Sequence, residues 1–310
     1  MKDARFSQPD WLAADWGTSH LRIWAIGGEG QVIGRKFGNC GMSHISKQDF
    51  EAEFIKLAEP FLSEDRTLDV ICCGMAGSRQ GWSEAAYVSV PCHPPNIARS
   101  STVRTLDSRI NVFILPGVKQ DAPPDVMRGE ETQIRGFMAA KPDFDGVICL
   151  PGTHTKWVHV SAGEIVSFQT FMTGELFSLL GRVSVLRHTV EGNSWDEPAF
   201  LASVDKAFGR PSAAAAQLFT LRAEALLNDP YVNVARSQLS GILIGIELAA
   251  AKPYWLGQEL AVLGADEVAK AYSAALRAQG LEVILAKSEE MTLEGLKHAY
   301  ATLHKLPSNA

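Results

Sequence analysis

The first half of the chain opens with three short apolar runs separated by polar turns, a pattern that predicts three strands. These runs lie at residues 11–15, 20–26 and 32–37. Apolar residues then recur at every third or fourth position from Phe50 to Phe61, which predicts an amphipathic helix with Ser46 as its N-cap. Two runs typical of buried parallel strands and one further helix complete this half, at residues 69–76, 112–115 and 129–141.

The second half of the chain starts in the same way. Three apolar runs predict strands at residues 147–150, 156–160 and 165–171. Helical periodicity follows at residues 174–187, 197–208, 212–228 and 233–251. Two strands are then expected to alternate with two helices, at residues 259–263, 266–279, 281–286 and 292–305. Each half should therefore form three antiparallel strands followed by alternating strands and helices, which is an α/β arrangement.

A short segment between the first two strands is echoed in the second half. Gly17 and Thr18 correspond to Gly152 and Thr153, and both pairs lie in a turn between a first and a second strand. Such a turn can offer backbone N–H groups and a hydroxyl to a phosphate oxygen, because glycine allows close approach. Two of these turns, one in each domain, could hold the β- and γ-phosphates of a nucleotide, and Asp15 could bind Mg²⁺. The alternative is that both are ordinary tight hairpins.

Length and composition limit the class of protein. At 310 residues the chain is long enough for two domains, expected at residues 1–142 and 143–310. A net charge of −6 without any block of like charges speaks against nucleic acid or a membrane surface as the main partner. The polar N-terminus lacks a signal core and the longest apolar stretch, 241–251, is too short to span a bilayer, so a cytoplasmic location is expected. Five cysteines without a CxxC pair argue against a disulfide framework or a zinc site.

Several segments resemble known phosphoryl-transfer motifs. The first resembles the leading phosphate motif of the superfamily that contains actin, sugar kinases and related phosphatases: Asp15-Trp16-Gly17-Thr18-Ser19. Four more resemble the 2-dehydro-3-deoxygalactonokinase family: Gly74-Met75-Ala76-Gly77-Ser78-Arg79-Gln80-Gly81-Trp82, Pro124-Asp125-Val126-Met127-Arg128-Gly129-Glu130-Glu131-Thr132-Gln133, Leu150-Pro151-Gly152-Thr153-His154-Thr155-Lys156-Trp157 and Phe171-Met172-Thr173-Gly174-Glu175-Leu176-Phe177. The likeness extends from about Trp11 to Leu303.

This resemblance implies an α/β fold of two ribonuclease H-like (actin-like ATPase) domains with a cleft between them. It also implies a kinase that uses ATP and Mg²⁺ to phosphorylate the terminal hydroxyl of the sugar acid 2-dehydro-3-deoxy-D-galactonate. The residues implied to bind the nucleotide are Gly17, Thr18 and Ser19 in the first turn, Gly152, Thr153, His154 and Thr155 in the second, and Gly264 at the adenosine. Leu150 stands where the commoner pattern has a second aspartate, so Asp15 alone is indicated as a metal ligand.

Transfer to an alcohol also needs a carboxylate that accepts the hydroxyl proton. Glu130 and Glu131 open the helix that closes the first half and are the best candidates, with Glu130 slightly preferred and Asp125 in reserve. The alternative is a structural role, because acidic residues in a first helical turn stabilise the helix by about 0.3–1 kcal/mol.

The carboxylate of a keto acid is matched by a guanidinium group. Arg79 fits best, because it follows a strand and lies between glycines, and Arg128 is the alternative. Trp82 could pack against the sugar chain or seal the core, and Glu175 could bind substrate hydroxyls or cap its helix. The full set expected at the substrate is Ser78, Arg79, Gln80, Trp82, Arg128 and Glu175.

Other classes of protein are less well supported. No P-loop, dinucleotide-binding glycine motif, HExxH or GxSxG sequence occurs in the chain. Three alternatives stay open: another sugar or sugar-acid kinase on the same fold, a polyphosphatase that needs no acceptor, and a non-enzymatic nucleotide sensor. The expected partners are a small sugar acid and ATP, and the sequence carries no signal for an oligomeric state.

Overall fold

The computed structural model describes residues 8–192, 194–228 and 232–303, which divide into two compact units. The first unit extends to Asp143 and also includes Gly163–Val166 and the residues from Glu289 onward. The second unit consists of Phe144–Ala162 and Ser167–Ser288. Both units combine a central sheet with helices, as the sequence predicts.

A six-stranded sheet forms the centre of the first unit, with the strand order β3-β2-β1-β4-β7-β6. Its strands are β1 (Trp11–Trp16), β2 (Leu21–Ile26), β3 (Val32–Gly38), β4 (Leu68–Gly74), β6 (Ser101–Val103) and β7 (Ile110–Ile114). β1, β2 and β3 are antiparallel neighbours, whereas β1, β4 and β7 run parallel. The parallel arrangement brings the carboxyl ends of β1 and β4 to one edge, where α/β proteins usually bind ligands.

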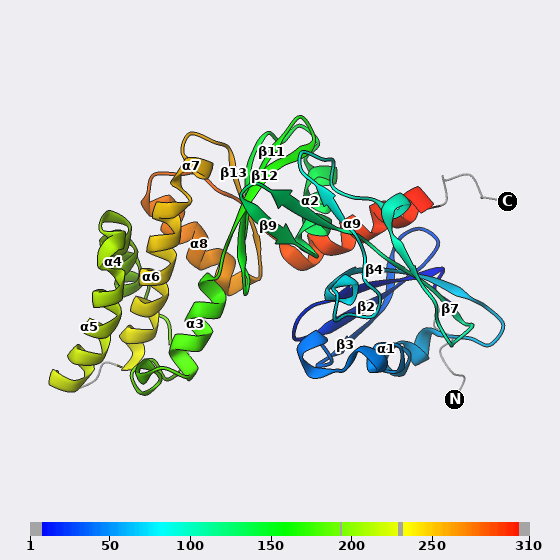
Figure 1. Cartoon of the computed structure of the whole chain (residues 1–310), viewed down its shortest axis with the longest axis horizontal. Helices are drawn as coiled ribbons and strands as arrows, with labels where there is room; N and C mark the ends of the chain where they lie inside the picture. The colour runs from blue at the N-terminus through cyan, green and yellow to red at the C-terminus, as the bar shows by residue number, and fades with distance from the viewer. Residues whose placement is uncertain (1–7, 193, 229–231, 304–310) are drawn as a thin grey trace. The chain divides into compact units, whose positions relative to one another are not determined.

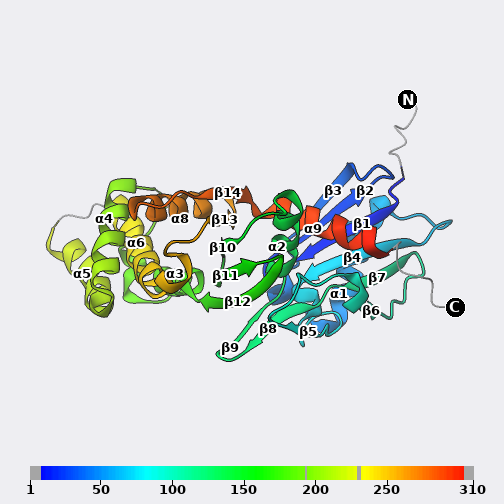
Figure 2. The ribbon, with the colours of Figure 1, turned by 90° about the horizontal axis from the view of Figure 1, so that it is seen from above.

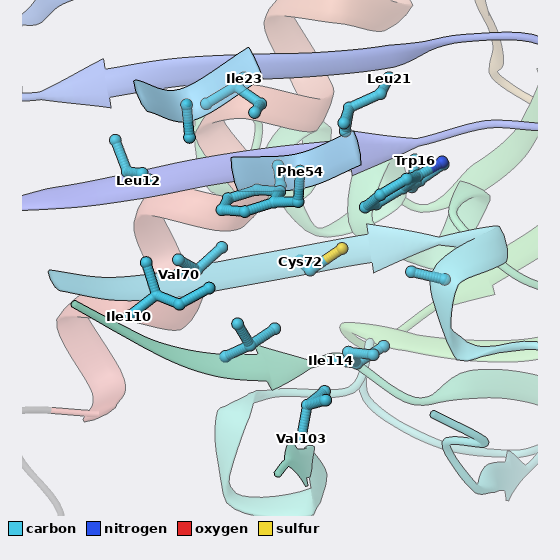
Figure 3. Packing of buried hydrophobic residues seen from close by; sticks show 14 of the residues in the cluster. Leu12, Trp16, Leu21, Ile23, Phe54, Val70, Cys72, Val103, Ile110 and Ile114 are labelled. Carbon is cyan, nitrogen blue, oxygen red and sulfur yellow. The ribbon is translucent and has the colours of Figure 1, made fainter. Parts of the chain in front are cut away.

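Alternate residues of β1 enter two different cores. Leu12 and Trp16 pack with helix α1 (Phe50–Ala58), and Trp11 and Ala13 pack with helix α9 (Ser288–Leu303). Figure 1 shows α1 and α9 on opposite sides of these strands, and Figure 3 shows Phe54 of α1 among the side chains of the first core. Because successive side chains of a strand point to opposite faces, these contacts bury both faces of β1, and its sequence is apolar from Trp11 to Ala14.

Helix α9 packs against α2 (Glu130–Ala140) within the first unit (Figures 1 and 2). Gly136 of α2 and Gly295 of α9 permit this, because a side chain at either position would collide with the backbone of the other helix. The ring of Tyr300 also stacks on Trp11, with centroids 4.3 Å apart. The last helix therefore lies with the first unit, although the sequence analysis grouped it with residues 143–310.

Other parts of the first unit differ from the sequence prediction. A three-stranded sheet of β5 (Tyr87–Ser89), β8 (Gly117–Asp121) and β9 (Pro124–Met127) was not predicted, and neither was β6. These strands are three to five residues long, too short for a clear alternation. Ser46 is also wrong as the N-cap of α1. Its hydroxyl bonds to the Asp49 carboxylate, a 3₁₀ turn follows at Lys47–Asp49, and α1 begins only at Phe50.

The second unit has a five-stranded sheet, β12-β11-β10-β13-β14, which repeats the order β3-β2-β1-β4-β7 of the first sheet. Its strands are β10 (Gly146–Leu150), β11 (Thr155–Ser161), β12 (Glu164–Phe171), β13 (Leu260–Gly264) and β14 (Ile284–Lys287). β10 and β11 are antiparallel, whereas β10, β13 and β14 run parallel. The same order in both sheets is that of ribonuclease H-like domains, so the predicted fold class is confirmed.

Helices cover the second sheet and extend beyond it. They are α3 (Thr173–Arg182), α4 (Glu197–Gly209), α5 (Ala214–Leu227), α6 (Val232–Ala250), α7 (Lys252–Trp255) and α8 (Asp266–Ala278). α4 and α6 lie close together, because Gly241 and Gly245 of α6 leave room for the α4 backbone at Phe200 and Val204. In the described part of the chain, we find no helix with the length and apolar character needed to cross a membrane.

Candidate functional site

The turn between β1 and β2 leaves two backbone amides available to a ligand. The carbonyl oxygens of Gly17, Thr18 and Ser19 accept hydrogen bonds from the amides of residues 41–43, and the Gly17 amide donates to His20 at 2.8 Å. Within the described residues, the amides of Thr18 and Ser19 have no protein acceptor, and both residues are exposed. The turn is thus held by its carbonyl groups and presents N–H groups that suit an anion.

Asp15 lies at the carboxyl end of β1, directly before this turn. Its Oδ2 accepts a hydrogen bond from Arg22 Nη1 at 2.8 Å, and Cys73 Sγ lies 3.8 Å from its Oδ1. Burial raises the pKa of Asp15, and the Arg22 charge opposes this shift. A single carboxylate beside free amides fits Mg²⁺, which usually takes one or two protein carboxylates and completes its shell with water and phosphate oxygens. The described residues contain no group of three His, Cys, Asp or Glu side chains that could hold a metal alone.

The carboxyl ends of β1 and β4 meet the amino end of α2. A side chain at Gly74, which has a φ of +83°, would collide with the Trp16 carbonyl, and one at Gly129, with a φ of +107°, would touch Gly74. These two glycines allow α2 to start beside β1. Glu130 is consequently near enough for its charge to contribute, after burial, to the raised pKa of Asp15.

Glu130 and Glu131 have different surroundings. Glu131 is 1% exposed, and its carboxylate accepts hydrogen bonds from the Gly129 amide at 2.7 Å and the Thr132 hydroxyl at 3.2 Å. Burial and, after it, the charge of Glu130 raise the pKa of Glu131 to about 8. Glu130 is only half-buried, and its carboxylate accepts a hydrogen bond from the Arg128 amide at 3.1 Å. Glu131 therefore caps the helix from inside, whereas Glu130 lies nearer the surface.

The segment after β4 contains four of the residues expected at the substrate: Ser78, Arg79, Gln80 and Trp82. Ser78 is buried, with its hydroxyl 3.0 Å from the sulfur of Met42, and Gln80 is exposed. Trp82 packs on the first core, with ring centroids 5.8 Å from Trp16 and 5.6 Å from Phe54. Trp82 thus anchors this segment to the sheet.

Two arginines near this segment differ in exposure. Arg79 is 81% exposed, and its Nε lies 3.8 Å from Glu84 Oε1. Arg128 is 9% exposed, donates from Nη2 to the Ala85 carbonyl at 2.7 Å and lies over the Tyr87 ring, 4.3 Å from its centroid. Its Nε and Nη1 are buried without a hydrogen-bond partner in the described structure. Of these two guanidinium groups, that of Arg79 is therefore exposed and that of Arg128 is buried.

The equivalent turn of the second unit lies between β10 and β11. The Thr153 carbonyl accepts a hydrogen bond from the Glu175 amide at 2.9 Å, and Gly174 leaves room for the Gly152 carbonyl. His154 Nε2 lies 2.6 Å from Glu175 Oε2. Gly152, Thr153 and His154 are exposed, so the start of α3 holds this turn from behind while its surface stays open.

The two residues that follow His154 point into the protein. Thr155 is fully buried, with its Oγ1 2.9 Å from Tyr272 Oη. Tyr272 Oη donates to Glu247 Oε2 at 2.8 Å. Lys156 is 6% exposed, and its Nζ donates to the His154 carbonyl at 3.1 Å. The structure therefore places the Thr155 side chain in the interior, not on the surface of the turn.

A cavity of about 460 Å³ opens beside this turn, within the second unit. Its walls come from α3, α6, α8 and the segment before α4, and include Gly152, Thr173, Phe177, Trp195, Arg236 and Tyr272. The Arg236 guanidinium lies 4.8 Å from the Phe177 ring centroid, and Trp195 is 48% exposed. The volume lies within the range of about 300–1,000 Å³ that is usual for small-molecule sites.

Sequence reasoning missed most of this lining. Arg236 and Ser240 are four residues apart and interrupt the apolar face of α6, a signal that could have revealed a polar site. Gly264, expected at the adenosine, ends β13 and lies against Ala269 of α8, while other residues of α8 line the cavity. Asp125, the reserve base, lies on β9 of the small sheet.

The two repeated sheets and their Gly-Thr turns define a protein of the actin-like ATPase and sugar kinase fold. The family model described as 2-keto-3-deoxy-galactonokinase matches residues 15–299. The chain belongs to this family, which confirms the predicted resemblance.

Individual relatives agree with this assignment. A probable 2-dehydro-3-deoxygalactonokinase of Rhizobium meliloti is 38% identical over 296 residues, which cover 93% of this chain and 96% of the relative. The 2-dehydro-3-deoxygalactonokinase of Escherichia coli K12 is 31% identical over 297 residues, covering 94% and 98%. A crystal structure of a candidate 2-dehydro-3-deoxygalactonokinase from Sinorhizobium meliloti superposes with a TM-score of 0.88 at 36% identity, covering 96% of this chain and 100% of that one.

Proposed function

We propose that the protein transfers the γ-phosphoryl group of ATP to the terminal hydroxyl of 2-dehydro-3-deoxy-D-galactonate. Membership of the family supports a sugar-acid kinase with ATP as the donor. The observation that carries the proposal is the repeated Gly-Thr turn. One copy lies beside Asp15 and Glu130, and the other opens onto a cavity of nucleoside size.

In this proposal the nucleoside occupies the cavity of the second unit. Arg236 and Trp195 offer flat surfaces on which a purine can stack. The phosphates leave the cavity past Gly152, where His154 and the exposed amides of the second turn bind them. The free amides of Thr18 and Ser19 in the first turn are assigned to the terminal phosphate.

Asp15 and Glu130 are assigned to the chemistry. Asp15 would hold Mg²⁺, and the ion, when bound, neutralises charge on the phosphate oxygens. Glu130 accepts the proton of the substrate hydroxyl, because it lies half-buried at the open end of α2. Glu131 is less suited, because its carboxylate is enclosed and already accepts hydrogen bonds from Gly129 and Thr132.

Arg79 is assigned to the carboxylate of the acid. Its guanidinium is exposed and lies 3.8 Å from Glu84 Oε1, too far for a hydrogen bond, so it can form two parallel hydrogen bonds to a carboxylate. Arg128 is the second candidate, because two of its nitrogens lack a partner among the described residues. The carboxylate of the sugar acid would satisfy Nε and Nη1 of Arg128 if the segment that contacts this side chain, at Ala85 and Tyr87, moved aside.

A coupled assay of ADP formation tests the function. With Mg²⁺ and ATP alone, the purified protein should release ADP slowly, and adding 2-dehydro-3-deoxy-D-galactonate should raise the rate strongly. The product should carry its phosphate ester on the terminal carbon, which ³¹P NMR identifies. The gluconate-derived epimer serves as a second acceptor, because it differs at one hydroxyl. Equal ADP release with and without an acceptor, or hydrolysis of polyphosphate instead, would contradict the proposal.

A further inference from the structure

Glu247 is a buried carboxylate that the proposed chemistry does not use. It lies on α6, is 2% exposed and accepts three hydrogen bonds. Trp157 Nε1 and Tyr272 Oη donate to it, each at 2.8 Å, and the Thr173 hydroxyl donates to it as well. Tyr272 in turn bonds to Thr155. One acidic side chain therefore joins β11, α3, α6 and α8.

Two of the three partners of Glu247 line the cavity, and the third, Trp157, lies on β11, the strand that follows the second turn. Thr173 and Tyr272 line the cavity directly. Thr173 precedes Gly174, which lies against the carbonyl of Gly152 in the turn. Glu247 itself is not among the lining residues, so it contacts the walls of the cavity from behind.

A carboxylate at this place needs a physical reason. Burial raises the pKa of Glu247, and hydrogen bonds from its neighbours oppose this shift. An apolar side chain of similar size would avoid the desolvation cost, and such replacements are often neutral or stabilising in other proteins. A satisfied polar network instead fixes one arrangement of the elements around it, because each buried donor loses its acceptor when an element moves.

We propose that Glu247 is a positioning residue for nucleotide binding. It holds the start of α3, α8 and the strand after the second turn in the single arrangement that fits the nucleotide. This inference rests on the proposed function, because it takes the cavity as the nucleotide site.

Binding of β,γ-imido-ATP with Mg²⁺, measured by calorimetry on the full chain, tests the proposal. Glu247→Gln keeps the volume but replaces one acceptor oxygen with a donor, so at least one of the three donors must turn away. We expect its Kd for the analogue to rise about tenfold, since a buried donor without an acceptor weakens the arrangement it belongs to. Steady-state kinetics should show the same rise in KM for ATP and no change in KM for the sugar acid.

Two further variants remove single donors without changing the packing much. Thr173→Val and Tyr272→Phe should each raise the Kd. Combining Tyr272→Phe with Glu247→Gln should add little, because both changes act on one network. The matched controls are Thr189→Val and Tyr254→Phe. Thr189 and Tyr254 belong to the same unit but do not line the cavity. Both variants should bind the analogue like the wild type.

The possible outcomes separate this inference from the proposed function. If Glu247→Gln lowers the melting temperature but binds the analogue like the wild type, Glu247 is merely structural and the inference is wrong. If the loss of binding free energy in the Tyr272→Phe/Glu247→Gln double variant equals the sum of the losses in the two single variants, Tyr272 acts by direct contact. The network role is then also wrong. Ala271→Phe, which fills the cavity, should abolish binding. Unchanged binding by that variant would instead overturn the nucleotide site itself.

Discussion

Nε2 of His154 lies 2.6 Å from Oε2 of Glu175, and the backbone amide of Glu175 donates to the carbonyl of Thr153. One residue at the start of α3 thus holds the second turn through both its backbone and its side chain. The carboxylate can therefore orient the imidazole ring, and the substrate contact expected of Glu175 from the sequence stays a prediction.

The His154–Glu175 pair is expected to serve ATP and not the sugar acid. Glu175→Gln should lower kcat/KM for ATP about tenfold, because the imidazole loses the group that orients it toward a phosphate oxygen. His154→Asn should cost a similar factor, and the double variant should lose little more than either single variant. Steady-state kinetics with each substrate varied in turn checks the effect.

A second His–Glu pair provides the control for this prediction. Nε2 of His93 lies 3.8 Å from Oε1 of Glu164 on the surface, and neither residue belongs to a Gly-Thr turn. Glu164→Gln should leave both KM values unchanged. A rise in KM for the sugar acid in Glu175→Gln, with KM for ATP unaffected, would contradict this prediction and support the substrate contact expected from the sequence.

Asp15 is expected to be required for turnover but not for folding. Asp15→Asn should reduce kcat about 100-fold or more, because the phosphates lose the carboxylate that positions their metal ion. The paired control is Asp10→Asn, since Asp10 also binds an arginine, Arg66, at 3.0 Å, but precedes the opposite end of β1. This control should retain activity. Wild-type turnover in Asp15→Asn would remove Asp15 from the site.

Glu131 is expected to make the fold less stable as the pH rises. The pKa of Glu131 is about 8 in the folded protein against an ordinary 4.5, because burial and Glu130 favour the neutral form, although Arg128 opposes them. The contribution of Glu131 to the free energy of unfolding is present in full below about pH 4.5. It is lost as the pH rises toward 8, because the unfolded chain alone releases the proton in that range.

Glu131→Gln stays neutral at every pH and tests this expectation. Between about pH 5 and pH 8.5, its free energy of unfolding should fall less than that of the wild type, by on the order of a few kcal/mol. Urea unfolding at the two pH values measures the difference. Glu294→Gln, on the exposed side of α9, should keep the wild-type pH dependence. Parallel pH profiles for wild type and Glu131→Gln would show that Glu131 is ionised in the folded state.

The fold and the two turns were readable from the sequence because their signals are local. Short continuous apolar runs locate β1 and β10, and each Gly-Thr pair follows its strand within a few residues. The association of α9 with the first unit was not readable. It depends on the contact between Gly136 and Gly295, which lie far apart in the sequence.

The cavity of the second unit illustrates the same limit. Its walls come from segments that are separate along the chain, such as Phe177, Arg236 and Tyr272, and no local motif connects them. Glu247 was visible only as the single charge within the apolar stretch at residues 241–251. Its role depends on donors from β11, α3 and α8, which only the folded structure brings together.

Arg79 and Arg128 are expected to respond differently to truncation. Arg79→Ala should raise KM for the sugar acid about tenfold (~1.4 kcal/mol) and leave the melting temperature unchanged, because the side chain is 81% exposed. Arg79→Lys should recover only part of the loss, since an ammonium cannot form the paired hydrogen bonds of a guanidinium.

Arg128→Met should lower the melting temperature, because it removes the hydrogen bond to Ala85. Arg35→Ala, another exposed arginine, controls for the loss of surface charge. If Arg128→Met raises KM for the acid and Arg79→Ala does not, the buried guanidinium is the carboxylate receptor.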